Sequence, residues 1–405
     1  MSACKINTRF TVIVPTRERC DTLIHTLNTI LVQDYDNFEV IVSDNVSNDG
    51  TRELVMRLRE QDSRISYLNT GQRVSMSENW EFALKNLKDG WVTVLGDDDG
   101  LLPGALSRVD QIIKKTGLKA IRSNGCSYSW PSLLSSTYGS MSISRRTGFV
   151  IRSSGHMLQK VLDGKCAYNE LPVLYNGGFI AASLLNEARD KSGKIFNSMT
   201  PDVYSGIVLS YLTEKYCYCY EPLAINGASA HSTGTAGFEG IVRKRGYDPV
   251  EKFYSESNIP FHPNFPLLSN GKPVRSIYAV VYEAFMQAKS FHRLKAVQIS
   301  SEKQLRIILL HSGPDHDEIM GWAKLFADKN YIDLNKIKIS KIESIFKRVS
   351  IILAKISNGL TRIKINGGTY IPMRNVFEAA LFAGLIHELS PSFFQAVKFR
   401  LKSMD

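Results

Sequence analysis

Short apolar, β-branched stretches alternate with amphipathic stretches over the N-terminal part of the chain. A short apolar run bounded by Pro, Gly or polar residues predicts a buried strand, whereas apolar residues three and four positions apart predict a helix. The pattern predicts strands at 10–14, 38–42, 64–68 and 91–95, and helices at 20–32, from 49 onward and at 75–87.

Strand and helix alternate four times in this region, and the connections between them are short. This order is typical of a parallel sheet built from right-handed crossovers. We therefore predict an α/β fold with a mostly parallel sheet flanked by helices. Pro15 is expected to end the first strand, because proline has no N–H group to donate.

The pattern becomes irregular after the fourth predicted strand. Clusters of Ser, Tyr and Gly at 120–175 predict loops and short strands that cover the mouth of the sheet. Further on, the pattern predicts helices at 178–190 and 201–213, a strand at 216–220 and a polar loop at 227–234.

Beyond about residue 240 the sequence is dominated by helical patterns and basic residues. We predict two domains: residues 1–238 as the α/β domain, and residues 239–405 as a mainly helical domain that contacts an acceptor, a membrane surface or another subunit. Segment 376–386 is apolar nearly all round, which predicts a buried or partner-binding helix.

Segment 339–357 combines apolar and basic residues at helical spacing. Its apolar residues share one arc of a helical wheel, and the opposite side holds Lys341, Lys347, Arg348 and Lys355. Such a basic amphipathic helix either packs its apolar face on its own domain or lies on a membrane surface. The sequence leaves both interpretations open.

The net charge of +11 is concentrated in the C-terminal part of the chain. Residues 236–405 hold 25 Lys and Arg but 15 Asp and Glu, so this part is the candidate for contact with an anionic partner. A nucleic-acid-binding protein is one class with such a charge. We find no arginine-rich tract and no glycine–aromatic RNA-binding signature, and we therefore do not expect a nucleic-acid partner.

Hydropathy and cysteine usage indicate the compartment. No uninterrupted apolar run reaches membrane-spanning length, and the first residues lack the apolar segment of a signal peptide. The six cysteines show neither metal-type spacing nor a disulfide framework. These features favour a reducing cytoplasm, with a peripheral position at the inner face of the cell membrane if the basic helix binds lipid.

The candidate chemistry centres on three consecutive acids. Asp97, Asp98 and Asp99 follow the predicted strand 91–95 directly, and open α/β folds bind ligands at such strand ends. Adjacent ionised carboxylates repel one another unless a cation holds them. Since the ligands would be oxygens, the expected ion is Mn²⁺ or Mg²⁺. The simpler interpretation is a solvated acidic turn.

Three motifs in order favour the cation site over that turn. They are Val12-Ile13-Val14-Pro15-Thr16-Arg17-Glu18-Arg19, then Phe38 to Thr51 with Asp44-Asn45 at the strand end, then Leu95-Gly96-Asp97-Asp98-Asp99. Together they resemble family 2 of the glycosyltransferases with the GT-A fold, which are inverting enzymes that use nucleotide sugars. The resemblance is strong over residues 9–110 and fades towards 235.

The resemblance assigns the acids to the diphosphate end of the donor. Asp98 matches the metal-ligating carboxylate of the family's Asp-x-Asp motif, and Asp97 and Asp99 are expected to hold the ribose or the sugar, or to share the metal. Gly96 stands where the first acid of the motif often stands. For this reason the sequence does not decide which of the three acids touches the ion.

The resemblance also assigns the nucleotide pocket. Asp44 matches an acid that accepts a hydrogen bond from the base, characteristically N3–H of uracil, so UDP is the expected nucleotide. Pro15, Thr16 and Arg17 are expected to line the same pocket, and Arg19 matches a basic position close to the phosphates. The alternative for Arg17 and Arg19 is that they are solvated loop residues.

Inverting transfer needs a base that takes the proton of the acceptor hydroxyl. Asp202 lies where the family places this acid, at the start of a predicted helix, with Pro201 before it in place of the usual Glu. The alternative is that Asp202 only stabilises the positive end of that helix. His231 in the polar loop is a candidate for a further metal contact, because enzymes with the GT-A fold often return a late histidine to the metal.

The sequence lacks the Gln-x-x-Arg-Trp motif and the transmembrane helices of processive family members. We therefore expect a glycosyltransferase that adds one or a few sugars to a glycan or lipid-linked acceptor, as in surface polysaccharide biosynthesis. A GT-A module that binds a nucleotide sugar without turnover is the main alternative.

Overall fold

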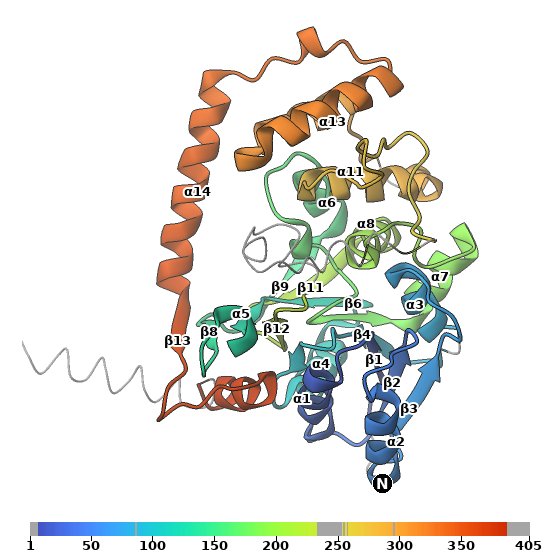
Figure 1. The fold of residues 1–405 in the computed structure, drawn as a ribbon, viewed down its shortest axis with the longest axis vertical. Helices are drawn as coiled ribbons and strands as arrows, with labels where there is room; N and C mark the ends of the chain where they lie inside the picture. The colour runs from blue at the N-terminus through green and yellow to red at the C-terminus, as the bar shows by residue number, and fades with distance from the viewer. Residues whose placement is uncertain are drawn as a thin grey trace, which may run out of the picture.

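The computed structural model describes residues 7–85, 87–232, 253, 256, 258–294 and 296–386. Its main sheet contains β1 (Phe10–Thr16), β2 (Phe38–Asp44), β3 (Ile65–Asn69), β4 (Trp91–Val94), β6 (Ala120–Ser123), β9 (Phe149–Ser153), β10 (Gly178–Ala181) and β11 (Lys215–Cys219). The strand order is β3-β2-β1-β4-β10-β6-β11-β9 (Figure 1).

The N-terminal half of this sheet is parallel, as predicted. β1 pairs with β2 and β4, and β2 pairs with β3, all in parallel register. The strands are separated by α1 (Cys20–Leu31), α2 (Thr51–Gln61) and α3 (Met76–Ala83). Val12 and Val40 are fully buried in one core cluster, and Ile13 is fully buried in another on the opposite face, because helices cover the sheet on both faces. The predicted α/β fold with a flanked, mostly parallel sheet is confirmed.

Two sequence predictions are wrong in detail. β1 continues through Pro15 to Thr16, because an extended backbone is compatible with the fixed φ of proline. Segment 178–190 is not one helix: it starts with β10, which lies antiparallel between β4 and β6, and continues as α7 (Ala182–Ser192). A short buried apolar run has the same appearance in a strand and in a helix, so periodicity could not separate them.

Segment 120–175 contributes more regular structure than predicted. It supplies β6 and β9 to the main sheet, and also the helix α6 (Ser154–Leu162). A second sheet has the order β13-β8-β7-β12-β5 and contains β5 (Gly100–Leu101), β7 (Cys126–Ser129), β8 (Ser140–Ser144), β12 (Ala224–Ala228) and β13 (Arg362–Asn366). This small sheet begins directly after the acid triplet.

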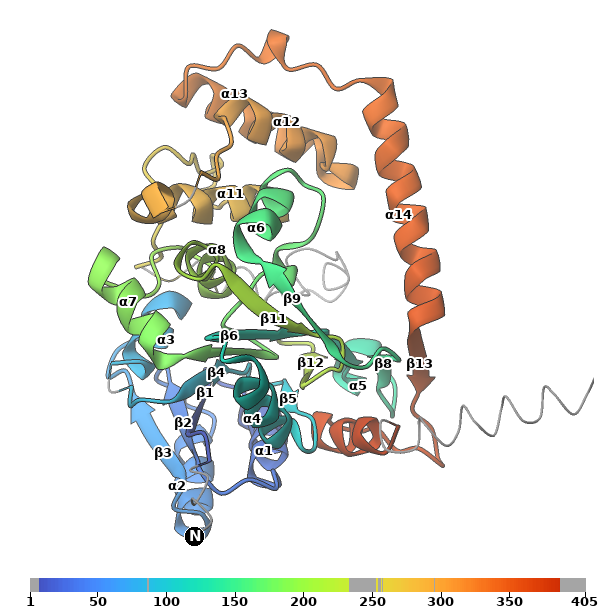
Figure 2. The same cartoon turned by 180° about the vertical axis from the view of Figure 1, so that it is seen from behind.

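The C-terminal region is mainly helical, as predicted. It contains α11 (Ile277–Gln287), α12 (Ser301–Leu310), α13 (His316–Lys329) and α14 (Lys341–Thr361). Its first three helices share one hydrophobic core with α6 and with α8 (Pro201–Leu212). The core therefore contains residues from both sides of the predicted boundary at 238. Figures 1 and 2 show α11 close to α6 and α8 in both views.

The last described segment returns to the small sheet. Residues 376–386 are helical, and Val376, Ala379 and Ala383 are buried in a cluster with Tyr128. The Tyr128 hydroxyl donates a hydrogen bond to the Met373 carbonyl over 2.8 Å. The prediction of a buried helix is confirmed for this face. Within the described residues, no helix combines the length and hydrophobicity needed to cross a bilayer.

Candidate active site

The carboxyl ends of β1, β2 and β4 meet at one edge of the sheet. Thr16 stands beside Asp44 in the register of β1 and β2, and Asp97 follows β4 by three residues. The chain progresses outward from β1 through β2 to β3 and then places β4 on the other side of β1. Such a reversal of strand order forms a crevice where α/β proteins bind ligands.

Asp97 joins the first and third motifs of the sequence. It accepts hydrogen bonds from the Thr16 hydroxyl and from Nη1 of Arg19, each over 2.8 Å. Burial raises the pKa of Asp97, and the Arg19 guanidinium opposes that shift. Burial also acts to lower the pKa of Arg19, but the carboxylates of Asp97 and Asp98 outweigh it and raise that pKa above its usual range.

Asp98 faces the polar loop that the sequence placed at 227–234. Its Oδ2 accepts hydrogen bonds from the hydroxyls of Ser229, over 2.7 Å, and of Ser232. Its main-chain carbonyl accepts a hydrogen bond from Trp130 Nε1 over 3.0 Å. A Cβ on Gly227 would lie 1.7 Å from this carbonyl, so the close approach of β12 requires glycine.

Asp99 is held by groups of the protein on both carboxylate oxygens. Oδ2 accepts from the Tyr175 hydroxyl over 2.7 Å and from the Gly96 N–H over 3.0 Å, and Oδ1 accepts from the Gly227 N–H over 2.8 Å. Burial and the adjacent Asp98 charge raise the pKa of Asp99 to about 7. Through these hydrogen bonds Asp99 connects Gly96, which follows β4, to Gly227 in β12.

The three acids differ in their capacity to bind a metal. Among the described residues, no group of three or more His, Cys, Asp and Glu is arranged to hold an ion alone. A divalent cation bound here would therefore share its coordination between the protein and other oxygen ligands. Asp98 fits this shared site, because the hydrogen bonds to its carboxylate from described residues fall on Oδ2 and leave Oδ1 as a hard oxygen ligand.

Asp44 is fully buried at the end of β2. Its Oδ2 accepts a hydrogen bond from the Tyr67 hydroxyl over 2.6 Å, and its Oδ1 accepts from the Ser47 N–H over 3.0 Å. Asn69 Nδ2 donates a third hydrogen bond, to Oδ2 over 3.3 Å. A carboxylate has about four acceptor positions, so these three bonds leave capacity for one further donor. The position of Asp44 beside Thr16 is compatible with the predicted base contact.

The two arginines of the first motif are not solvated. Arg17 forms an ion pair with Glu256, and Arg19 donates through Nη2 to the carbonyl of His231. Burial raises the pKa of Glu256 to about 7, although Arg17 acts to lower it. The alternative, that Arg17 and Arg19 are solvated loop residues, is therefore wrong. His231 lies close to Arg19 through its main chain, while its predicted metal contact stays a prediction.

Asp202 begins α8, where it was expected. Its Oδ2 accepts a hydrogen bond from the Tyr168 hydroxyl over 2.8 Å. Burial raises the pKa of Asp202, and the Tyr168 hydrogen bond acts to lower it. A raised pKa is what a carboxylate base needs to take a proton near neutral pH.

Tyr175 connects Asp202 to the acid triplet. Burial is the largest influence on its pKa, and the charges of Asp99, Asp98 and Asp202 also raise it. Behind it, buried Arg122 donates Nη1 to the carbonyls of Tyr175 and Asn176, over 2.8 and 2.7 Å. The charge of Asp202 thus acts on the same tyrosine hydroxyl that donates a hydrogen bond to Asp99.

Sequence reasoning missed several residues that position these acids: Tyr168, Tyr175, Arg122, Trp130, Ser229 and Ser232. The tyrosines, Arg122 and Trp130 lie in the segment interpreted as irregular, where no periodicity marks them. The serines lie in the polar loop singled out for His231. For Ser229 and Ser232, the polar composition of this loop was the one sequence feature that indicated a functional segment.

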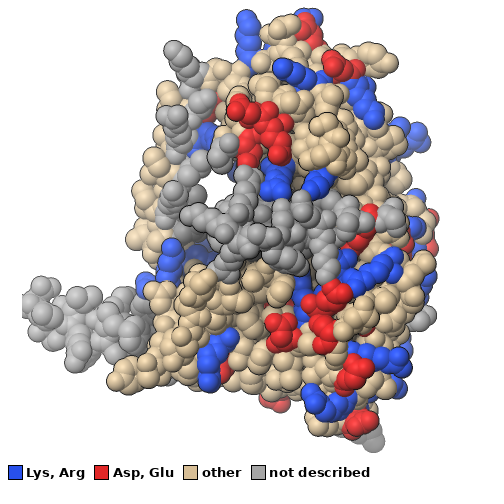
Figure 3. Space-filling model, viewed as in Figure 1, with Lys and Arg blue, Asp and Glu red and all other residues tan. Residues whose placement is uncertain are grey.

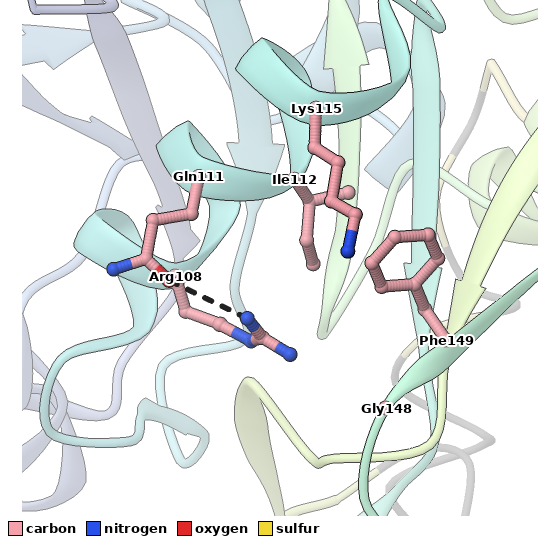
Figure 4. Close-up of a pocket in the computed structure, with 6 residues that line it drawn as sticks. All are labelled: Arg108, Gln111, Ile112, Lys115, Gly148 and Phe149. Atoms are coloured by element: carbon pink, nitrogen blue, oxygen red, sulfur yellow. Dashed lines mark hydrogen bonds between the residues drawn. The ribbon is translucent and has the colours of Figure 1, made fainter.

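A separate hollow lies between α4 (Ala105–Thr116) and the start of β9, with a volume of about 570 Å³ (Figure 4). It is lined by Arg108, Gln111, Ile112, Lys115, Gly148 and Phe149. Arg108 is already paired with both Glu221 oxygens, over 2.8 and 3.1 Å, and Lys115 lies 5.3 Å from the Phe149 ring centroid. None of the predicted site residues lines this hollow.

The fold and the site together define an α/β domain with acids and arginines at a strand-order reversal. Residues 11–150 match the model of glycosyl transferase family 2. This match is limited to that part of the chain, and it agrees with the resemblance that the three sequence motifs carry.

Two curated proteins are similar to about a quarter of the chain. One is the GalNAc(5)-diNAcBac-PP-undecaprenol beta-1,3-glucosyltransferase of Campylobacter jejuni, 39% identical over 104 residues, which are 25% of this chain and 34% of that protein. The other is glycosyltransferase GlyA of Streptococcus pneumoniae, 30% identical over 94 residues, which are 23% of this chain and 13% of that protein. The chain thus spans at most about a third of these relatives.

Solved structures show a distant overall similarity. The mannosyltransferase PcManGT from Pyrobaculum calidifontis, in complex with GDP-Man and Mn²⁺, is 15% identical with a TM-score of 0.41, and the match covers 95% of this chain and 88% of that one. S. aureus TarS 1–349 in complex with UDP-GlcNAc is 14% identical with a TM-score of 0.42, and covers 80% of this chain and 92% of that one.

The raised pKa of Asp99 predicts a pH-dependent stability. In the unfolded chain Asp99 ionises near its ordinary pKa of 3.8, whereas the folded state keeps the proton up to about pH 7. The stabilisation of the folded state that comes from the raised pKa of Asp99 is therefore complete below pH 3.8 and is lost as pH rises to about 7. Relative to Asp99→Asn, we expect the unfolding free energy of the wild type to fall by roughly 1 kcal/mol per pH unit in this window.

Urea unfolding at several pH values in EDTA measures this difference. Asp36→Asn, at an exposed acid, is the matched control and should give a curve parallel to the wild type. Parallel curves for wild type and Asp99→Asn would show that Asp99 does not titrate in the buried state described above.

Proposed function

We propose that the chain is an inverting, metal-dependent glycosyltransferase that moves a sugar from a nucleotide sugar, with UDP as the expected nucleotide, to a hydroxyl of a glycan or lipid-linked acceptor. The observation that carries this proposal is the pair of hydrogen bonds from Thr16 and Arg19 to Asp97. They join two separate motifs at one strand edge, within the segment that matches family 2.

At the donor end, this chain's residues balance the charge of the diphosphate. Arg19 lies beside the acids. Asp98 Oδ1 would hold Mn²⁺ or Mg²⁺, with His231 as a further ligand. The bound cation would stabilise the negative charge of the departing nucleotide diphosphate. In this proposal, Asp44 selects the base, Pro15, Thr16 and Arg17 line its pocket, and Asp97 and Asp99 fix the positions of neighbouring groups.

At the acceptor end, Asp202 takes the proton. Its carboxylate removes the hydrogen of the acceptor hydroxyl while that oxygen attacks the anomeric carbon from the side opposite the leaving diphosphate. This attack inverts the anomeric configuration. The raised pKa of Asp202 supports the assignment, and the Tyr168 hydrogen bond holds the carboxylate in position.

The acceptor class and location are part of the proposal. The name of the Campylobacter relative includes an undecaprenol-linked oligosaccharide, which supports a lipid-linked acceptor here. Such an acceptor would be met at the inner face of the cell membrane, with the chain peripheral to it. In the same proposal, residues 1–238 form the catalytic domain and residues 239–405 carry acceptor, membrane or oligomer contacts.

One observation favours the non-catalytic alternative. Both carboxylate oxygens of Asp97 and of Asp99 already accept hydrogen bonds from the protein, which makes them less available as metal ligands. A module that binds a nucleotide sugar without turnover would not need such ligands. A nucleic-acid-binding role has less support, because acidic and basic side chains are interspersed on the face drawn in Figure 3. Turnover separates the first alternative from the proposal.

A panel of nucleotide sugars with Mn²⁺, scored for release of nucleotide diphosphate, tests the function. We expect one donor to be consumed, EDTA to abolish the release, and Asp98→Asn to lower it by at least about a hundredfold, since the variant loses the charge that binds the cation. Asp36→Asn is the control. Donor binding without release, by the wild type and with every acceptor tried, would favour the non-catalytic module.

The base assignment makes a separate prediction. Asp202→Asn should keep donor binding and lose about 10²–10⁴-fold in transfer rate. Tyr168→Phe removes a hydrogen bond that lowers the pKa of Asp202, so the acidic limb of its pH–rate profile should move to higher pH. Full transfer by Asp202→Asn, or an unshifted profile for Tyr168→Phe, would contradict the roles of these residues.

A further inference from the structure

Helix α14 leaves a row of aliphatic side chains in solvent. Its exposed members are Ile345, Val349, Ile352, Leu353, Ile356 and Leu360, with exposed fractions between 45 and 73%. We name these six residues the α14 stripe. The interpretation that this helix packs its apolar face on its own domain is therefore wrong for these residues. Burying large aliphatic side chains is favourable, so a continuous exposed row indicates a binding surface.

The stripe is continuous along the helix. Its members follow one another at spacings of one, three and four residues, which places them on a single arc roughly 100° wide. The arc extends over most of the 21 residues of α14. A straight apolar arc of this kind suits a flat partner better than a compact pocket.

Contacts at both ends fix the helix at the margin of the molecule. Near its start, Glu343 pairs with Arg306, and Lys347 Nζ donates to the Leu310 carbonyl over 2.8 Å. At its end, the Thr361 carbonyl accepts a hydrogen bond from the Arg145 N–H over 2.8 Å. Figures 1 and 2 show α14 as a long column along one side of the protein.

The charge of α14 indicates the chemistry of the partner. The helix contains four basic residues, Lys341, Lys347, Arg348 and Lys355, and Glu343 is its only acid in sequence. By helical register, positions 341, 348 and 355 recur every seven residues along one edge of the stripe, and only position 347 is on the opposite side of the helix. The prediction that all four basic residues lie opposite the apolar arc is therefore wrong. Positive charge beside an aliphatic arc is the pattern of helices that lie in the interface of an anionic bilayer.

We propose that the α14 stripe docks this chain on an anionic phospholipid surface, with the helix axis parallel to the membrane plane. A second copy of the chain is a poorer occupant. Pairing two stripes face to face would bring the basic residues of both copies together, and that repulsion opposes the contact. Anionic lipid headgroups instead compensate the same charges.

The position of α14 connects this surface to the candidate active site. β13 follows the helix directly and pairs antiparallel with β8 in the small sheet. In that sheet β7 links β8 to β12, whose Gly227 N–H donates to Asp99. Membrane docking would thus fix the orientation of the acids toward the bilayer. The docking surface itself does not depend on the proposed function, whereas this consequence does.

Vesicle sedimentation of the full chain tests the proposal. The probes are vesicles of phosphatidylcholine alone and of phosphatidylcholine with about 30 mol% of the anionic lipid phosphatidylglycerol. We expect binding to the anionic vesicles that weakens as salt rises, and at least a roughly tenfold lower partition coefficient for Ile352→Ser/Leu353→Ser/Ile356→Ser. The control is Leu134→Ser/Leu325→Ser/Leu381→Ser, which removes three aliphatic side chains of similar exposure elsewhere.

Three outcomes would overturn the proposal: no binding by the wild type, equal binding by the stripe variant and the wild type, or a lipid-free dimer that the stripe variant abolishes. Circular dichroism establishes that both triple variants are folded. The donor-consumption assay is run in parallel without lipid. An active chain that ignores vesicles would reject the docking surface alone, and a vesicle-bound chain with no turnover would reject the proposed function alone.

Discussion

The structure depends on the burial of three consecutive carboxylates at the end of β4. Side by side, their charges repel, and burial makes that repulsion larger. The protein meets the cost by giving each acid its own donors: Thr16 and Arg19 for Asp97, two serines for Asp98, and Tyr175 with two backbone N–H groups for Asp99. These donors come from distant parts of the chain, so the acids determine which segments must meet.

That constraint explains why the region after the parallel strands is built as it is. β12 approaches the main-chain carbonyl of Asp98 so closely that only glycine fits at position 227. Trp130, which follows β7, donates a hydrogen bond to the same carbonyl. Arg122 fixes the turn that carries Tyr175. The same small sheet continues through β8 to β13, which connects the acids to the C-terminal helices.

Much of this arrangement was predictable from sequence, but only where the pattern is local. The apolar runs identified β1, β2, β3 and β4, and the acids at their ends gave the site, because parallel strands bring their carboxyl ends to one edge. Tyr168 and Tyr175 were not predictable, since a lone tyrosine in an irregular segment carries no periodic signal. Nor did the pattern of α14 decide between packing and exposure, because an amphipathic helix has the same sequence in both situations.

The central claim is that Asp98 binds a cation together with the donor diphosphate at this strand edge, within reach of Asp44. A crystal structure of the chain with UDP and Mn²⁺, with the ion located by its anomalous scattering, tests it most directly. The account predicts manganese in contact with an Asp98 oxygen and the diphosphate, with the uracil beside Asp44. Manganese or nucleotide bound away from these residues would contradict it.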